Sequence, residues 1–278
     1  MNIFDASTLI FLISISAGFL GAITGLGGGV VIIPVLTILF GVDIRYAIGA
    51  SLVSVIATSS GAAAAYVKEG FTNIRIGMFL EIATTLGALV GAVLATIVST
   101  SAIAVIFGIV LVYSAGQSIQ PRRERSGEIR PDKLAQMLRM NSTYPSPEGA
   151  KAYFVERIPG GLGIMMTAGI LSGLLGTGSG AFKVLAMDQV MRIPFKVSTT
   201  TSNFMIGVTA AASAGVYLNR GYVDPGLAMP VMLGALLGSL LGTKVLVRTP
   251  VQRLRMVFGV VILVLAIEMI YNGITGSI

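Results

Sequence analysis

The sequence contains no cysteine and no histidine. Without thiols and imidazoles, disulfides, thiol catalysis, haem ligation and the usual zinc sites are excluded. Charged residues are scarce as well, at 11% of the chain, whereas they make up about 25% of soluble domains. A metal would have to be held by a few carboxylates, so we expect neither a metal nor a cofactor.

Apolar residues dominate the composition. They account for 54% of the 278 residues, and the mean hydropathy of +0.88 is typical of a multi-spanning membrane protein. The first apolar run, residues 9–23, is not preceded by Lys or Arg, so we interpret it as a mature helix and not as a signal peptide. Much of the net charge of +7 lies after Ile119, which indicates a cytoplasmic loop. We therefore expect a lipid bilayer as partner, and no nucleic acid.

Ten apolar segments can be marked along the chain, at residues 5–24, 30–40, 46–67, 74–98, 101–119, 160–175, 181–192, 197–218, 226–247 and 254–272. Most are long enough to cross about 30 Å of hydrocarbon. The segments at 30–40 and 181–192 would form helices of only about 16–18 Å. Each follows a glycine-rich break, and such a break is tolerated at membrane depth only where it is buried in protein or lines a cavity.

The second half of the chain repeats the first at an offset of 151 residues, without a gap from Gly18 and Gly169 onward. Glycines of the two breaks coincide, as do Tyr66 with Tyr217 and Gly87 with Gly238. The sequence therefore predicts a first transmembrane repeat at 1–119, a basic loop at 120–159 and a second repeat at 160–278.

An odd number of segments in each repeat would invert the second repeat relative to the first. We expect an all-α membrane protein with two inverted-topology repeats of about five hydrophobic segments, whose short or re-entrant helices meet near the midplane. The basic loop should be cytoplasmic and both termini outside. Within the loop, residues 131–140 are predicted to form a short amphipathic helix with Leu134, Met137 and Leu138 on one side.

The starts of the two short helices are the predicted binding site. The first backbone N–H groups of a helix lack partners, and the helix dipole adds positive charge there, so anions are attracted. The expected contacts are Gly27, Gly28, Gly29 and Val30 in the first repeat, and Gly178, Ser179, Gly180 and Ala181 in the second. As an alternative, the glycines only permit close helix packing.

Lys183 follows the second break closely, where the first repeat has Ile32. A cation at this depth is costly unless it is paired or hydrated, so we expect an anionic substrate as its counter-ion; snorkelling toward an interface is the alternative. Ser51, Thr200 and Asn203 could add hydroxyl and amide contacts without additional charge.

Two carboxylates are candidates for proton coupling, Glu81 and Asp188. Glu81 could carry a proton or pair with Lys183 or Arg75. Asp188 lies five residues beyond Lys183 and would not share its helical face. No second carboxylate is spaced for acid–base chemistry, so we do not expect an enzyme.

These motifs resemble the TauE/SafE family of sulfite exporters. The resemblance rests on Gly25-Leu26-Gly27-Gly28-Gly29 with Pro34, on Ala50-Ser51-Leu52, and on the repeated break. It implies a multi-spanning permease of the cytoplasmic (inner) membrane for sulfite or small organosulfonates such as sulfoacetate. The second motif departs from the family pattern, because it continues as Ala181-Phe182-Lys183 and lacks the proline.

We therefore predict a secondary transporter that moves a small anion across the inner membrane by alternating access of one repeat against the other; the resemblance implies outward transport. Two alternatives stay open, an intramembrane enzyme acting on lipid phosphates and a passive anion channel. The exact anion, the coupling ion and the formation of a homodimer are left open as well.

Overall fold

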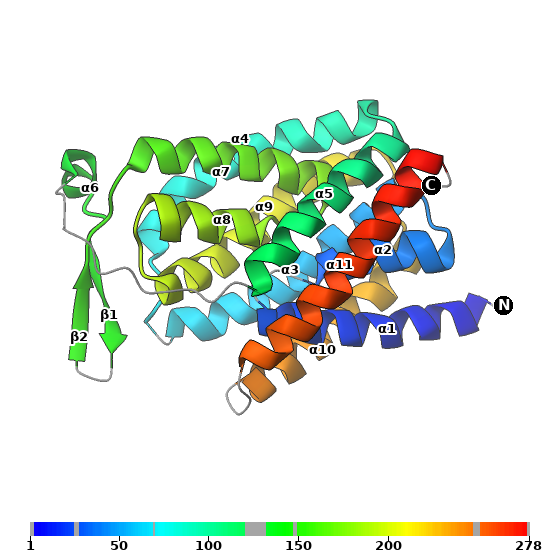
Figure 1. Cartoon of the computed structure of the whole chain (residues 1–278), viewed down its shortest axis with the longest axis horizontal. Helices are drawn as coiled ribbons and strands as arrows, with labels where there is room; N and C mark the ends of the chain where they lie inside the picture. The colour runs from blue at the N-terminus through cyan, green and yellow to red at the C-terminus, as the bar shows by residue number, and fades with distance from the viewer. Residues whose placement is uncertain are drawn as a thin grey trace.

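The computed structural model describes residues 3–24, 28–68, 70–119, 132–146, 149–246 and 251–276, and it is helical at every predicted apolar segment (Figure 1). The first half forms α1 (Ile3–Thr24), α2 (Gly29–Phe40), α3 (Ile44–Lys68), α4 (Ile74–Ile97) and α5 (Thr100–Ile119). The second half forms α7 (Ile158–Leu175), α8 (Gly180–Leu185), the π-helical η1 (Ala186–Val190), α9 (Phe195–Asn219), α10 (Pro225–Leu246) and α11 (Val251–Thr275).

The helices of the two halves exchange partners. α1 packs on α10 just as α7 packs on α4, while α3 packs on α9 and α5 on α11. The closest contacts follow the offset of 151 residues: a methyl group on Gly87 would collide with the Met166 carbonyl, and one on Gly238 with the Ile15 carbonyl. The glycines thus allow backbones of different halves to touch, as small residues do between membrane helices.

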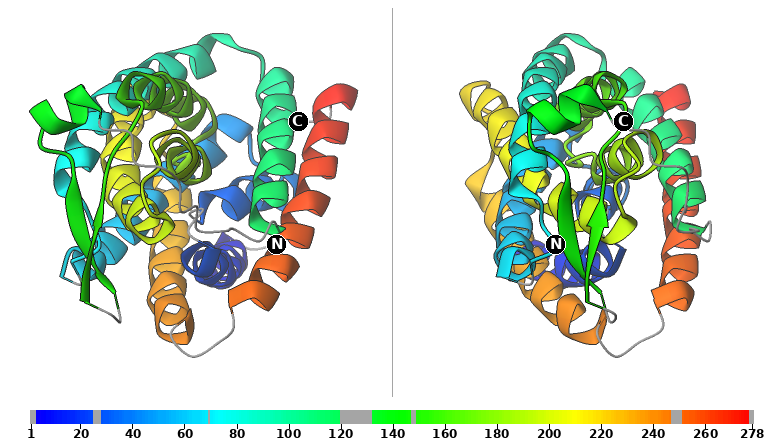
Figure 2. Two further views of the ribbon diagram at one scale, coloured as in Figure 1. Left: turned by 60° about the vertical axis from the view of Figure 1, so that its left-hand side comes forward. Right: turned by 90° about the vertical axis from the view of Figure 1, so that its left-hand side faces the viewer.

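Helices α5 and α11 form a separate pair at one edge of the molecule. Figure 2 shows them side by side, apart from the other long helices. Phe107, Leu111, Ile262 and Ala266 from the two helices are buried together in the larger apolar core. Residues 251–258 of α11 belong to a part of the helix whose side chains are outside the described set.

Among the described residues, four helices are long and apolar enough to cross a membrane, namely α1, α4, α7 and α10. Their exposed faces carry large apolar side chains, such as Leu86 and Val90 on α4 and Leu237 and Leu241 on α10. The central helices α3 and α9 are less apolar, because they contain buried serines and threonines. Apolar faces therefore point outward and polar side chains inward, as expected of a protein surrounded by lipid.

The central loop contains structure that the all-α prediction missed. Residues Ser142–Ser146 (β1) and Gly149–Tyr153 (β2) pair as an antiparallel hairpin, preceded by the short helix α6 (Lys133–Met137). The predicted short helix is present, and of the three residues expected on its apolar side Leu138 packs against a buried apolar cluster, whereas Leu134 and Met137 are 42% and 80% exposed. Ala135 is the residue of the helix that is buried, because the helix packs through its small side chain.

The hairpin is anchored to the start of α4. Asn73 caps this helix by accepting a hydrogen bond from the Ile76 N–H (3.1 Å), and its Nδ2 donates to the Tyr153 hydroxyl (2.6 Å). Met140 and Tyr153 are buried with Met187 in the second apolar core. The loop therefore closes one end of the space between α4, α7 and α9.

Candidate functional site

The second glycine break is a sharp turn between α7 and α8. Gly176, Gly178 and Ser179 all have positive φ, at 66°, 71° and 45°. Glycine adopts this conformation without cost, whereas serine does so uncommonly. The chain then turns back: η1 ends beside the start of α7, where the Glu156 N–H donates to the Met191 carbonyl (3.1 Å). The α8–η1 segment therefore re-enters toward the side from which α7 began.

The first break is described only from Gly28 onward, so the predicted site residue Gly27 lies outside the described residues. Gly28 precedes α2, and the Val31 and Ile32 N–H groups donate to its carbonyl, each at 3.1 Å. α2 begins at Gly29, one residue before the predicted Val30. The helix runs for 12 residues, about 18 Å, which is too short to cross the hydrocarbon core.

The two breaks lie against each other in the interior. A Cβ placed on Gly29 would be 3.1 Å from the Gly176 carbonyl oxygen and would collide with Ser51 Oγ. Ser51, from α3, donates a hydrogen bond to that same carbonyl at 3.0 Å. Ser202, at the equivalent position of α9, donates to the Gly180 carbonyl at 3.3 Å. Hydroxyl groups of the central helices thus bind the backbone of the second break.

A narrow pocket opens where the breaks meet. Its lining comes from α2, from the second break with α8, and from α5: Val30, Phe107, Val110, Leu111, Ser114, Thr177, Ser179, Gly180, Ala181 and Phe182. Ser179 is buried, and its hydroxyl has no hydrogen-bond partner. Tyr113 stacks on Phe182 with ring centroids 5.0 Å apart. An unsatisfied buried hydroxyl at a pocket wall is available to a bound ligand.

The α5 wall of this pocket was missed at the sequence level. Phe107, Val110, Leu111 and Ser114 are spaced by three and four residues, which places them on one face of a helix. The helix is apolar on every face, so this spacing does not by itself distinguish the pocket face from a lipid-facing one.

The structure brings some of the predicted site residues to the pocket. Val30, Ser179, Gly180 and Ala181 line it. Gly29 and Ser51 are not part of the lining, but both contact the carbonyl of Gly176, the residue before the lining residue Thr177. Gly28 and Gly178 belong to the breaks but are not part of the lining: a Cβ on Gly28 would approach Gly18, and one on Gly178 would approach Ile206.

Other predicted site residues lie elsewhere. The Thr200 hydroxyl donates within its own helix, to the carbonyl of Lys196 (3.0 Å) or Val197 (3.1 Å). Asn203 is half-buried on α9, and Asp188 is half-buried on η1. None of these three residues is part of the pocket lining. Their contact with a substrate, and proton coupling through Asp188, stay predictions.

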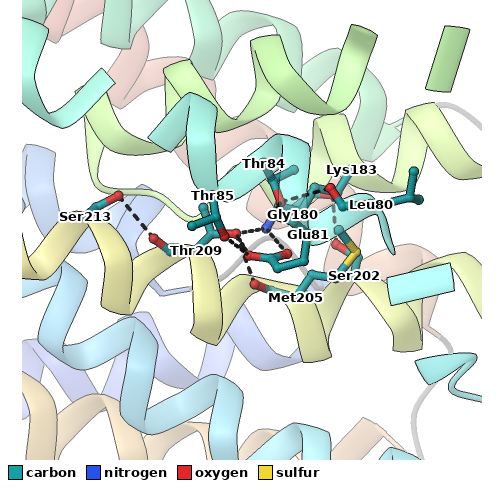
Figure 3. Close-up of polar contacts among 10 residues, drawn as sticks. All are labelled: Leu80, Glu81, Thr84, Thr85, Gly180, Lys183, Ser202, Met205, Thr209 and Ser213. Carbon is teal, nitrogen blue, oxygen red and sulfur yellow. Dashed lines mark hydrogen bonds and ion pairs between the residues drawn. The ribbon is translucent and has the colours of Figure 1, made fainter. Parts of the chain in front are cut away.

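Lys183 is completely buried, and its charge is balanced by Glu81 of α4 (Figure 3). The ammonium nitrogen lies 3.8 Å from Glu81 Oε2 and donates a hydrogen bond to Thr209 Oγ1 of α9. The counter-ion of Lys183 in this structure is therefore a carboxylate of the protein. Of the pairings considered for Glu81, the one with Lys183 is confirmed.

Thr209 lies between the two charges. Its hydroxyl is within hydrogen-bond distance of Glu81 Oε1 and of the Met205 carbonyl, and it can donate to one of them at a time. Thr85 also donates to Glu81 Oε1, at 3.2 Å, whereas Glu81 Oε2 has no hydrogen-bond partner. The cluster connects α8 with α4 and α9 through buried polar groups.

The charged cluster belongs to one repeat position only. The counterparts of Lys183 and Glu81 at the offset of 151 residues are Ile32 and Met232. The two breaks are therefore similar in backbone but different in charge. In the described part of the chain, no group of three His, Cys, Asp or Glu side chains could hold a metal ion.

Almost the whole chain matches one protein family. The sequence model of the family described as "Sulfite exporter TauE/SafE" matches residues 10–269. The chain belongs to this TauE/SafE family. No solved structure matches the chain.

Individual proteins similar to this chain carry transporter names. The Bacillus subtilis (strain 168) protein named "Probable membrane transporter protein YunE" is 27% identical over 273 residues, covering 96% of this chain and 98% of the relative. A second B. subtilis protein, "Probable membrane transporter protein YdhB", is 27% identical and covers 85% and 87%. A "Probable membrane transporter protein" of Xylella fastidiosa (strain 9a5c) is 24% identical and covers 92% of both chains. Together with the apolar helices, the family identifies a multi-pass membrane transporter.

Proposed function

We propose that the protein is a secondary transporter that moves a small anion, sulfite or a small organosulfonate such as sulfoacetate, outward across the cytoplasmic membrane by alternating access. The observation that carries this proposal is the pocket at which the two glycine breaks meet, with the unpartnered hydroxyl of Ser179 in its wall. The family description supplies the sulfur oxyanion as substrate class.

The chemistry of the pocket supports an anion. Val30 lies in the first turn of α2, where backbone N–H groups lack helical partners and the helix dipole is positive. Ser114, Thr177 and Ser179 add hydroxyl groups, and no ionisable side chain is part of the lining. Neutral donors can replace water around an oxyanion and still release it, whereas a fixed opposite charge would hold it more tightly.

We place the two repeats in opposite orientations. Two features support this arrangement: the exchanged helix contacts, and the opposite directions of α1 and α7 in Figure 1, where α7 begins beside the hairpin and α1 begins at the far end. The basic central loop is then cytoplasmic, and both termini are outside.

The packing of helices from one repeat on helices of the other also limits which helices can move during alternating access. A movement of one whole repeat against the other would separate α1 from α10 and α4 from α7, both of which are packed through glycines. α5 lines the pocket and packs mainly on α11, and this pair has few contacts with the remaining helices. We therefore assign the opening movement to α5 with α11.

The test is transport by purified protein in liposomes, with sulfite, sulfate, thiosulfate, sulfoacetate and phosphate offered in turn. Saturable uptake of at least one sulfur oxyanion is expected. Transport of a neutral solute in preference to every anion would refute the proposal. Flux that never saturates would indicate a passive channel, and phosphate release from a polyprenyl phosphate would indicate an enzyme.

A pair of variants tests the position of the site. Val110 lines the pocket, whereas its neighbour Ile109 is 58% exposed on the outer face of α5. Val110→Phe should fill the pocket and reduce anion uptake at least tenfold, while Ile109→Phe should keep it. Equal uptake by both variants would place the substrate elsewhere.

A further inference from the structure

We propose that Glu81 is the binding site of a proton that travels together with the anion, and that protonation of Glu81 frees the charge of Lys183 for the substrate. The inference rests on the proposed function and adds its coupling ion. It starts from the buried cluster of Glu81, Thr209 and Lys183 (Figure 3).

The cluster is directly connected to the pocket. Lys183 lies on α8, immediately after Phe182, and one turn after Ser179, both of which line the pocket. Its ammonium group is held on the opposite side by α4 and α9, through Glu81 and Thr209. A change in the charge of Glu81 therefore acts on the helix that carries the substrate contacts.

Lys183 is the charged group that faces Glu81 within the described residues. α7 contains no ionisable residue, and on α4 the neighbours of Glu81 are the uncharged Thr84 and Thr85. From α9, the side chain that reaches Glu81 is Thr209, which is neutral. The other charged residues of the packed elements are Asp188 on η1, Arg75 in the first turn of α4 and Lys196 in the first turn of α9.

The charge balance of the cluster changes when Glu81 binds a proton. In the structure, the carboxylate neutralises the ammonium group in an interior where an unpaired charge is costly. A proton on Glu81 Oε2, which has no hydrogen-bond partner, turns the carboxylate into a carboxylic acid and leaves Lys183 without a counter-ion. A bound anion then restores neutrality, so the proton and the anion favour each other's binding.

Release follows the reverse order. When the anion leaves, Lys183 again needs a counter-ion, and Glu81 supplies it by losing its proton. No bond other than the O–H bond of the carboxyl group is formed or broken. Each transport cycle therefore moves one proton in the same direction as one anion, and export down the anion's own gradient carries a proton out.

The experiment uses purified protein in liposomes, with the membrane potential held at zero by potassium and valinomycin. The probe is labelled sulfoacetate, whose charge does not change near neutral pH. The external solution is more acidic than the interior. If one proton is coupled to each anion, the equilibrium ratio of internal to external sulfoacetate should rise about tenfold for each unit of pH difference. An internal pH indicator should record one proton entering with each anion.

Two variants separate coupling from transport. Glu81→Gln resembles the protonated state, so it should still exchange internal for external sulfoacetate but lose accumulation driven by the pH difference. Glu268→Gln is the matched control, because Glu268 is an exposed carboxylate on α11, and it should accumulate like the wild type.

The outcomes are distinguishable. Net uptake of sulfoacetate by the wild type without proton entry overturns the proton site and leaves the transporter intact. Accumulation by Glu81→Gln that follows the pH difference also overturns it. If the wild type exchanges none of the five anions named above, the proposed function itself fails, and the proton site with it. The proton count on the wild type needs no variant and holds even if Glu81→Gln does not fold.

Discussion

Breaking the Lys183–Glu81 pair should cost far more stability than removing both charges. The two groups are 3.8 Å apart, with side-chain exposures of 0% and 7%. Lys183→Met leaves the buried carboxylate without a partner, and such a loss typically costs about 3–5 kcal/mol. Lys183→Met combined with Glu81→Gln leaves no charge, while the amide oxygen of glutamine can still accept from Thr85 and Thr209.

The double variant should therefore be within about 1.5 kcal/mol of the wild type, because replacing both members of a buried pair by neutral groups is often close to neutral. The measurement is the free energy of reversible unfolding in mixed micelles for the wild type, both single variants and the double variant. The interaction energy from this double-mutant cycle should be at least about 4 kcal/mol, because each single variant leaves a buried charge without a partner whereas the double variant leaves none.

A matched control is Lys151→Met, because Lys151 is exposed on the hairpin and its removal should change stability by less than about 0.5 kcal/mol. If Lys183→Met were as stable as the double variant, Glu81 would not depend on Lys183 for its counter-charge. That result would refute both the pairing and the charge balance on which the proton site depends.

Three further changes can be measured in the same unfolding assay. Gly91→Ala should lower the free energy of unfolding by about 1–3 kcal/mol, because its Cβ would collide with the Ile170 carbonyl. Gly215→Ala is the control, because its Cβ would enter open space. Equal effects of the two variants would contradict the close packing at Gly91. Tyr217→Phe should cost about 1 kcal/mol by removing the donor to the Gly173 carbonyl. Asn73→Ala should cost about 1–2 kcal/mol and expose the hairpin to protease; unchanged proteolysis would show that Asn73 does not anchor it.

Some of the fold could be predicted because its signals are local. Hydropathy located the apolar helices, and the repeated glycines located both breaks, including the short α2 and the re-entrant α8–η1. A break at Gly176 or Gly178 is readable because positive φ favours glycine. The hairpin at 142–153 was not readable, because strand formation depends on neighbours more than on intrinsic preference.

The candidate site was predictable only in part, because some of its residues follow local glycine signals and others are defined only by contacts between distant helices. Val30 and Ala181 follow glycine breaks, so their position at helix starts could be inferred from the sequence. Val110 belongs to an apolar helix whose every face resembles a lipid-facing face, and hydropathy does not distinguish the face that covers a pocket.

The sequence by itself determined that this chain is a membrane protein of the TauE/SafE family with a duplicated, glycine-broken helix pattern, because hydropathy and glycine spacing act within one segment. Only the tertiary structure decided which helices exchange partners, and that the counter-ion of Lys183 is Glu81, 102 positions earlier in the chain. The physical reason is that a buried charge needs a partner in space, and nothing in the local sequence specifies which distant helix supplies it.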